Sequence, residues 1–244
     1  MTTMRGSELK AGVFIGGVAV VGAALIGKSF FEAAGEWGTA RGLAWAAIAL
    51  LTVFLGNLAV RIPVRECKVS FSDAFLFLSV VLFGPALATL TGALDGMAAS
   101  TRRRGTWFKR VFNTASIAIT TNLSARLFEA TAPHDGLWGD GGFSPLDYLG
   151  PLLLVTVAQY AINTALVAGV LTLKEGASFV TVWRHTTPWA GTAFLAGAAS
   201  VALALLLAHD LGLLTFVALA PIPAIVYISY RSWLGHPVGA RKED

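Results

Sequence analysis

The sequence has few charged residues and only one cysteine. Charged residues occupy 13% of its 244 positions, against roughly a quarter in soluble globular domains. Hydrophobic residues make up 55% of the chain, and the mean hydropathy is +0.69. This composition excludes an ordinary soluble domain and predicts an integral membrane protein. The lone Cys67 excludes a disulfide within the chain.

Motifs of common enzyme classes are also missing. The sequence has no HExxH, GxSxG or Walker loop, and no paired intramembrane aspartates of the protease type. A retinal-type pigment is excluded because residues 187–230 contain no lysine. A transmembrane haem pair is not expected either, since all four histidines fall in expected loops or at span ends: His134, His185, His209 and His236. We therefore expect no catalytic residues, no metal and no cofactor.

Long hydrophobic runs, by contrast, fill most of the chain. We expect hydrophobic segments at about 10–29, 42–60, 70–83, 86–100, 109–129, 147–172, 187–208 and 211–230. Several approach the roughly 20 residues that a helix needs to cross a bilayer, and none alternates like a strand of an outer-membrane barrel. The predicted fold is an all-α, polytopic transmembrane helical bundle. It forms a single domain over 1–232, followed by a short cytoplasmic tail over 233–244.

The connecting loops differ sharply in charge. Residues 100–110, STRRRGTWFKR, contain five basic residues and no acid, whereas 129–147 contain four acids and no Lys or Arg. Because cytoplasmic loops are rich in Lys and Arg, the first loop is expected inside, the second outside, and both termini in the cytoplasm. This bias also accounts for the net charge of +4, so no nucleic-acid partner is expected.

The stretch 71–96 is apolar but has an aspartate near each end and Gly84-Pro85 in the middle. Two crossings, with Gly84-Pro85 at the outer tip, keep the preceding cations inside, as the charge rule favours: Arg61, Arg65 and Lys68. Each half, however, rises only about 21 Å, less than the roughly 30 Å of a bilayer core. We therefore predict a broken, partly buried hairpin that lines an internal cavity, with one or two crossings left open.

Polar side chains inside spans are costly and tend to face the bundle interior. The candidate ligand-binding residues are Asn57, Asp73, Asp95, Asn113, Gln159 and Asn163. Gln159 and Asn163 share a helix face because they are four residues apart. In the alternative interpretation the amides only link helices, Asp95 pairs with Arg102 or Arg103, and Asp73 caps a helix start.

Four short motifs follow one another along the chain: Phe71-Ser72, Gly84-Pro85, Phe112-Asn113 and Asn163-Thr164. In this order they resemble the membrane-associated sensor (MASE-type) domain that precedes bacterial GGDEF and HD-GYP output domains, over about residues 60–232. The resemblance implies a sensory module of the bacterial inner membrane that relays a signal to a cytoplasmic cyclic-dinucleotide or kinase output, in cis or in a partner. Only RSWLGHPVGARKED follows the last expected span, so we expect either a separated sensor or a free-standing relative.

A second interpretation is a substrate-capture (S-component-like) subunit of a vitamin or small-molecule importer. Such subunits are similar in having a Gly-Pro break followed by a Gly-x-x-x-Asp-like stretch, here Gly92 and Asp95-Gly96. Small residues on the first helix, which they use against a shared scaffold, are also present as Gly12, Gly16 and Ala19. Both interpretations give the chain the lipid bilayer and an unidentified small or lipophilic ligand as partners.

The last two expected spans are the ones through which we expect a signal to be transmitted. We expect 211–232 to form one helix past the inner interface, with 187–208 packed through Ala193 and Gly197 as the moving contact. Small residues at this spacing, as at Gly12 and Gly16, favour close helix contact within one chain or between two. A homodimer therefore stays open.

Overall fold

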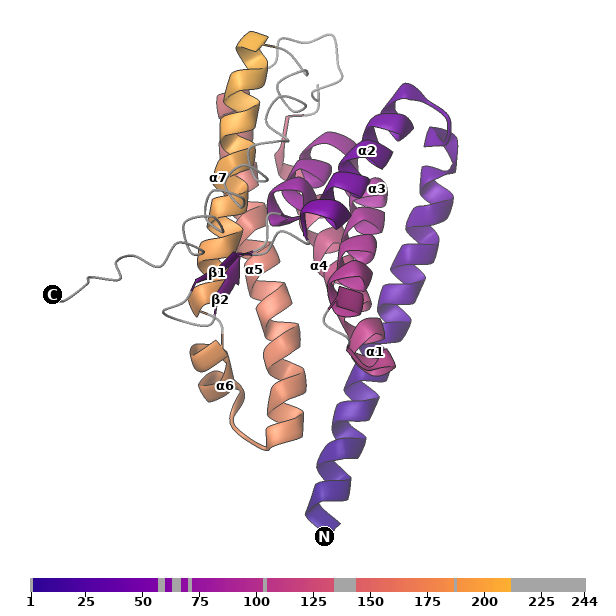
Figure 1. Cartoon of the computed structure of the whole chain (residues 1–244), viewed down its shortest axis with the longest axis vertical. Coiled ribbons are helices and arrows are strands. Elements are labelled where there is room, and N and C mark those ends of the chain that lie inside the picture. The colour runs from indigo at the N-terminus through magenta and orange to yellow at the C-terminus, as the bar shows by residue number, and fades with distance from the viewer. Residues whose placement is uncertain are drawn as a thin grey trace, which may run out of the picture.

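Helices make up most of the residues that can be described. The computed structural model describes residues 2–56, 60–62, 67–69, 72–102, 105–133, 144–186 and 188–211. The helices are α1 (Thr2–Glu32), the 3₁₀ helix η1 (Ala33–Glu36), α2 (Ala40–Leu55), α3 (Ser72–Arg102), α4 (Trp107–Thr131), α5 (Pro145–Glu175), α6 (Phe179–Thr186) and α7 (Pro188–Leu211). Figure 1 shows α2, α3 and α4 between α1 on one side and α5 and α7 on the other. The predicted helical bundle is confirmed.

One short sheet interrupts the helical pattern. Strands β1 (Val60–Ile62) and β2 (Cys67–Val69) pair antiparallel, with Arg61 opposite Lys68. The expected hydrophobic segment at 42–60 is longer than α2, which ends at Leu55. The strands therefore fill part of the connection between α2 and α3 (Figure 1).

Helix boundaries follow from local chemistry. The Thr39 hydroxyl accepts a hydrogen bond from the Gly42 N–H at 3.0 Å, which satisfies one of the free donors at the start of α2. Pro145 opens α5, where its fixed φ fits the first helical position. At the other end of α5, Gly176 adopts φ 69°, a left-handed conformation that terminates helices and that glycine adopts without strain.

By length and composition alone, three described helices could cross a membrane, and the middle one, α3, contains a break at Gly84. They are Gly6–Glu36, Ser72–Arg102 and Pro145–Glu175. Large apolar side chains also lie on the outside of the bundle: Val20 and Leu50 are each 71% exposed, and Phe31 is 78% exposed. Extensive exposed apolar surface marks contact with a membrane or with another protein. The composition, length and exposure of the helices together indicate a membrane protein.

The expected eight hydrophobic segments are not supported. Besides the three long helices, the described residues contain two shorter apolar ones, Ala40–Leu55 and Ala193–Leu207. The segment at 109–129 forms α4, whose buried residues include Ser116, Thr120, Thr121, Asn122 and Ser124. These inward-facing polar groups lower its hydropathy below that of a lipid-facing span. The segment at 211–230 lies, except for its first residue, outside the described residues.

Helix α3 is broken at Gly84, which has φ 74° and ψ −176° inside an otherwise helical run. The Ser79 and Thr91 hydroxyl oxygens, twelve residues apart, are hydrogen bonded at 2.9 Å. A straight helix would separate these residues by about 18 Å. The two halves of α3 therefore fold back on each other as a hairpin, and the sequence-based prediction of a helix break at Gly84-Pro85 is confirmed.

The hairpin lies in the middle of the bundle. In its most apolar window 72% of residues are buried, against 17% in α1 and 33% in α5. The main apolar core joins it to α2, α4, α5 and α7 through side chains such as Phe77, Leu87, Val155 and Leu205. Short helices at membrane depth need such shelter because lipid satisfies no backbone group. The predicted burial of the hairpin is thus also confirmed, and the internal cavity that it was expected to line stays a prediction.

Glycines let α3 and α4 approach closely. A Cβ atom on Gly92 would lie 2.6 Å from the Thr121 hydroxyl, and one on Gly96 would lie 2.9 Å from Thr114 Cα. On the other side of α4, a Cβ on Gly22 of α1 would overlap the Ala115 Cβ. Small residues at helix crossings are the usual means of close packing in membranes. They hold α4 between the hairpin and α1.

Candidate functional site

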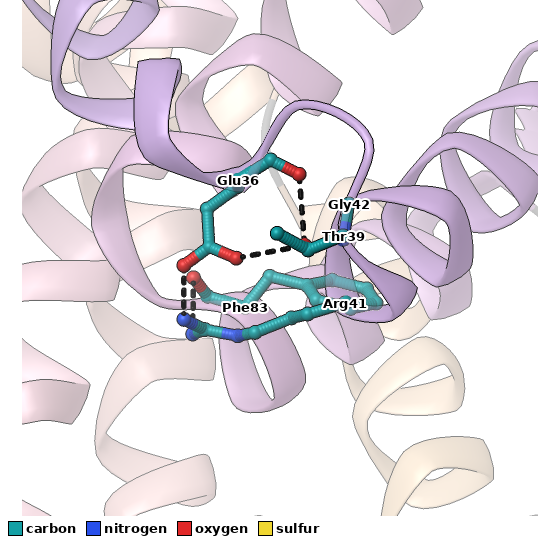
Figure 2. Close-up of polar contacts among 5 residues, drawn as sticks. All are labelled: Glu36, Thr39, Arg41, Gly42 and Phe83. Carbon is teal, nitrogen blue, oxygen red and sulfur yellow. Dashed lines mark hydrogen bonds and ion pairs between the residues drawn. The ribbon is translucent and has the colours of Figure 1, made fainter.

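The tip of the hairpin is bound by residues of η1 and of the first turn of α2 (Figure 2). Arg41 Nη1 forms an ion pair with Glu36 Oε1 at 2.7 Å, and its Nη2 donates to the Phe83 carbonyl at 3.1 Å. Thr39 donates to the Glu36 carbonyl at 2.8 Å. The Phe83 carbonyl belongs to the last turn before the break, where helical partners are missing. Arg41 therefore satisfies a backbone acceptor that the break in α3 exposes.

A tryptophan joins the two halves of the hairpin to α2. Trp45 Nε1 donates to the Leu87 carbonyl and to the Thr91 hydroxyl, both at 2.9 Å. Thr91 is also the partner of Ser79. Ser79 and Thr91 are both fully buried. Trp45 therefore fixes α2 to the buried part of the hairpin through its ring nitrogen.

A second polar chain begins beside the break and runs to the outside of α4. Thr89 donates to the Pro85 carbonyl at 2.6 Å and lies 2.9 Å from Asn122 Nδ2, which donates to it. Arg126 Nε donates to Asn122 Oδ1 at 3.1 Å. Asn122 is buried, whereas Arg126 is exposed. The chain of bonds thus connects the start of the second hairpin half with a charged side chain at the surface.

The far end of the hairpin is fixed to α2 by Arg102. Its Nη1 donates to the Val53 carbonyl at 3.1 Å, in the last turn of α2. A Cβ on Gly56 would lie 2.6 Å from Arg102 Nη2, so the absence of a side chain at Gly56 makes room for the guanidinium. Arginine thus binds a backbone carbonyl at both ends of the contact between α2 and α3.

The predicted site residues do not form one cluster in the structure. Asn57 lies outside the described residues. Asp73, in the first turn of α3, and the buried Asp95 lie on opposite halves of the hairpin. Gly197 of α7 packs against this end of the hairpin, since a Cβ there would lie 3.3 Å from the Asp73 Cβ. Asp73 thus lies at the base of the hairpin, next to α7.

The three amides occupy different levels of the bundle. Asn113 Nδ2 donates to the Ser100 hydroxyl at 3.0 Å, linking α4 to the end of the hairpin. Gln159 is buried, and its Nε2 lies 3.5 Å from the Thr121 hydroxyl, linking α5 to α4. Gln159 Oε1 is buried with no donor among the described residues. Asn163, one turn further along α5, is half-buried.

Sequence reasoning did not select the hydroxyl groups that hold the hairpin together. Ser79, Thr89 and Thr91 stand inside apolar runs, where a serine or threonine usually bonds to its own helix four residues back. Thr89 and Thr91 do form that bond as well, to Pro85 and Leu87. The only sequence signal was their gathering on both sides of Gly84-Pro85.

The polar side chains of the described bundle are used mainly in bonds between helices and to their own helix backbone. Among the described residues no group of three or more His, Cys, Asp or Glu side chains gathers to hold a metal ion. Gln159 Oε1 is one of several buried polar atoms that have no hydrogen-bond partner among the described residues. No protein-family model, no curated protein and no solved structure matches this chain.

Proposed function

We propose that the chain is an integral membrane sensory module that binds a small or lipophilic ligand and relays the signal to a cytoplasmic cyclic-dinucleotide or kinase output, in cis or in a partner. The observation that supports this most is the hairpin of α3, which is bonded to α2 and α4 and packed at its base against α7. A movement of the hairpin would therefore reach α7, which leads toward the C-terminus.

The ligand in this proposal binds near the amides of α5. Gln159 Oε1 accepts a hydrogen bond from the ligand, and Asn163 on the same helix face completes the site. A ligand shifts an equilibrium only if it binds the two states with different affinities. Helix α5 contacts both α4 and α7, so a shift of α5 is the step that would distinguish the two states.

The test is a fusion of residues 1–240 to a diguanylate cyclase, measured by cyclic-di-GMP output in cells. We expect Asn163→Leu and Gly197→Leu each to change the output several-fold, because the first alters the ligand site and the second drives a side chain into the Asp73 backbone. Gly150→Leu is the matched control, since a Cβ added at the exposed Gly150 would meet nothing within 4 Å. Unchanged output in both test variants, with normal expression, would remove the support for signalling.

A specific observation also favours the importer-subunit alternative. Gly12 and Gly16 on α1 face open space, since a Cβ added at either position would meet nothing within 4 Å, so this face is free to pack against another helix. The importer alternative predicts that the chain copurifies with a transporter scaffold and ATPase encoded in its own genome. Gly16→Leu should abolish that copurification, while Gly150→Leu should leave it intact. Absence of copurification in the wild type would argue against this alternative.

A further inference from the structure

A groove lies between α1 and the first turns of α4, away from the hairpin network. Its volume is about 150 Å³, and its walls are formed by small or apolar side chains that include Ala19 and Ala23 of α1, Met97 of α3 and Val111 of α4. Trp107 and Arg110 also line it. The groove therefore combines apolar walls with one cation and one large aromatic ring.

The Arg110 guanidinium is held in place by one bond and keeps donors to spare. Its Nε donates to the Gly105 carbonyl at 3.0 Å. Among the described residues Nη1 and Nη2 make no hydrogen bond, and an Arg fork with two free nitrogens matches the geometry of a phosphate. The first turn of α4 contains no acidic residue, and its free N–H groups add partial positive charge. This end of the groove is therefore complementary to an anion.

Neighbouring side chains indicate that this end lies at a membrane interface. Trp107 is 70% exposed and Phe108 is 73% exposed, and Lys109 beside them is also exposed. Tryptophan and basic residues at a helix end are typical of the headgroup region. Basic pockets between transmembrane helices bind anionic lipid headgroups. The apolar walls continue from Arg110 along α1 and α4 in the direction that an acyl chain would take.

We propose that this groove binds an anionic phospholipid, with the phosphate on Arg110 and one acyl chain along Ala19, Ala23 and Val111. The proposal depends on the chain being in a membrane and not on the sensory function. The bound lipid connects α4 to α1, the least buried of the three long apolar helices described, since only 17% of its apolar window is buried. Lipid binding would stabilise that contact by mass action.

Trp107 provides a direct readout of the site. The protein is reconstituted into phosphatidylcholine vesicles, and a lipid with a brominated acyl chain is added in increasing fractions. In one series the brominated lipid is phosphatidylglycerol, and in the other it is phosphatidylcholine. Bromine quenches tryptophan fluorescence on contact. Subtracting the signal of Trp107→Phe gives the share of Trp107. We expect brominated phosphatidylglycerol to reach half-maximal quenching of Trp107 at an about fivefold lower fraction than brominated phosphatidylcholine. One basic side chain near an anionic lipid headgroup would give a preference of this size.

Two variants that each remove one positive charge separate the site from general surface charge. Arg110→Gln should abolish the preference for phosphatidylglycerol, whereas Lys109→Gln should retain most of it, because Lys109 is exposed and does not line the groove. Equal quenching by both lipids in the wild type, or equal loss of preference in both variants, would overturn the proposal. If Arg110→Gln does not fold, Arg110→Lys replaces it in the test. An Arg110→Lys variant that prefers phosphatidylglycerol as strongly as the wild type would overturn the assignment of the phosphate to the guanidinium fork.

Discussion

At the residue scale, Arg41 shows how a single side chain supports a broken helix. It binds Glu36 and the Phe83 carbonyl at the hairpin tip (Figure 2). We expect Arg41→Met to lower the free energy of unfolding by roughly 1–2 kcal/mol, since a hydrogen bond from a charged donor to a backbone acceptor is lost and solvent screens part of the effect. Thermal unfolding in detergent, followed by circular dichroism, measures the change.

A surface ion pair on α1 provides the matched control. Lys28 and Glu32 lie 3.5 Å apart on one helix face, and both side chains are exposed. Lys28→Met removes the same type of charge but leaves no backbone carbonyl unsatisfied, so we expect a change of about 0–0.5 kcal/mol. Equal effects of the two substitutions would show that the bond to Phe83 contributes nothing.

Asn122 and Thr89 give a second test at this scale, because their bond joins α4 to the hairpin inside the bundle. A double-mutant cycle with Asn122→Leu and Thr89→Val isolates the interaction. We expect a coupling energy of about 0.6–1.7 kcal/mol, the range found for polar contacts between membrane helices. Additive effects of the two substitutions on unfolding would contradict the bond. A cycle of Asn122→Leu with Thr131→Val, in which Thr131 bonds only within α4 among the described residues, should show no coupling.

At the scale of elements, the break in α3 depends on one backbone conformation. Gly84 has φ 74°, and a Cβ there would meet nothing within 4 Å. Gly84→Ala should therefore destabilise the protein by roughly 1–3 kcal/mol through backbone strain alone. Gly27→Ala is the control, because Gly27 has equally open space but lies in a regular helix, where alanine is favoured.

Unfolding midpoints of the two alanine variants should move in opposite directions. A midpoint for Gly84→Ala equal to that of the wild type would mean that the break does not need a left-handed residue. That result would favour a continuous helix through residue 84 of α3.

The sequence was sufficient to predict the break in α3 and the burial of its halves. Gly84-Pro85 within a long apolar run supplies both a left-handed position and a residue that starts helices, and halves shorter than the bilayer need shelter. The partners of the hairpin were not predictable, because hydroxyl groups such as Ser79 and Thr91 bond equally well within one helix. The count of spans failed for a related reason: several polar residues of α4, such as Thr120 and Asn122, face the core.

Several of the candidate site residues chosen from the sequence do lie inside the bundle. In the structure, however, they lie at separate places and not in one site. Asp73 lies at the hairpin base, whereas Gln159 lies at the contact of α5 with α4. Spacing along one helix shows which residues share a face but not which face of another helix they meet.

At the scale of the whole molecule, the charge of the loops predicts the orientation in the membrane. Both termini should be cytoplasmic and the hairpin tip should lie toward the outer face. In a Cys67→Ser background, Ala86→Cys should react with a membrane-impermeant thiol reagent added to intact cells, whereas Thr3→Cys should react only after the cells are opened. Labelling of position 3 from outside intact cells would contradict the orientation.

The hairpin is the feature on which the whole arrangement depends, and disulfide cross-linking tests it most directly. In the Cys67→Ser background, Ser79→Cys with Thr91→Cys should form an intramolecular disulfide on mild oxidation, since the native oxygens lie 2.9 Å apart. Ser79→Cys with Ser100→Cys is the control and should stay reduced, because Ser100 lies about 13 Å further along the second half. A straight α3 would keep positions 79 and 91 about 18 Å apart; absence of the 79–91 disulfide in folded protein would contradict the hairpin.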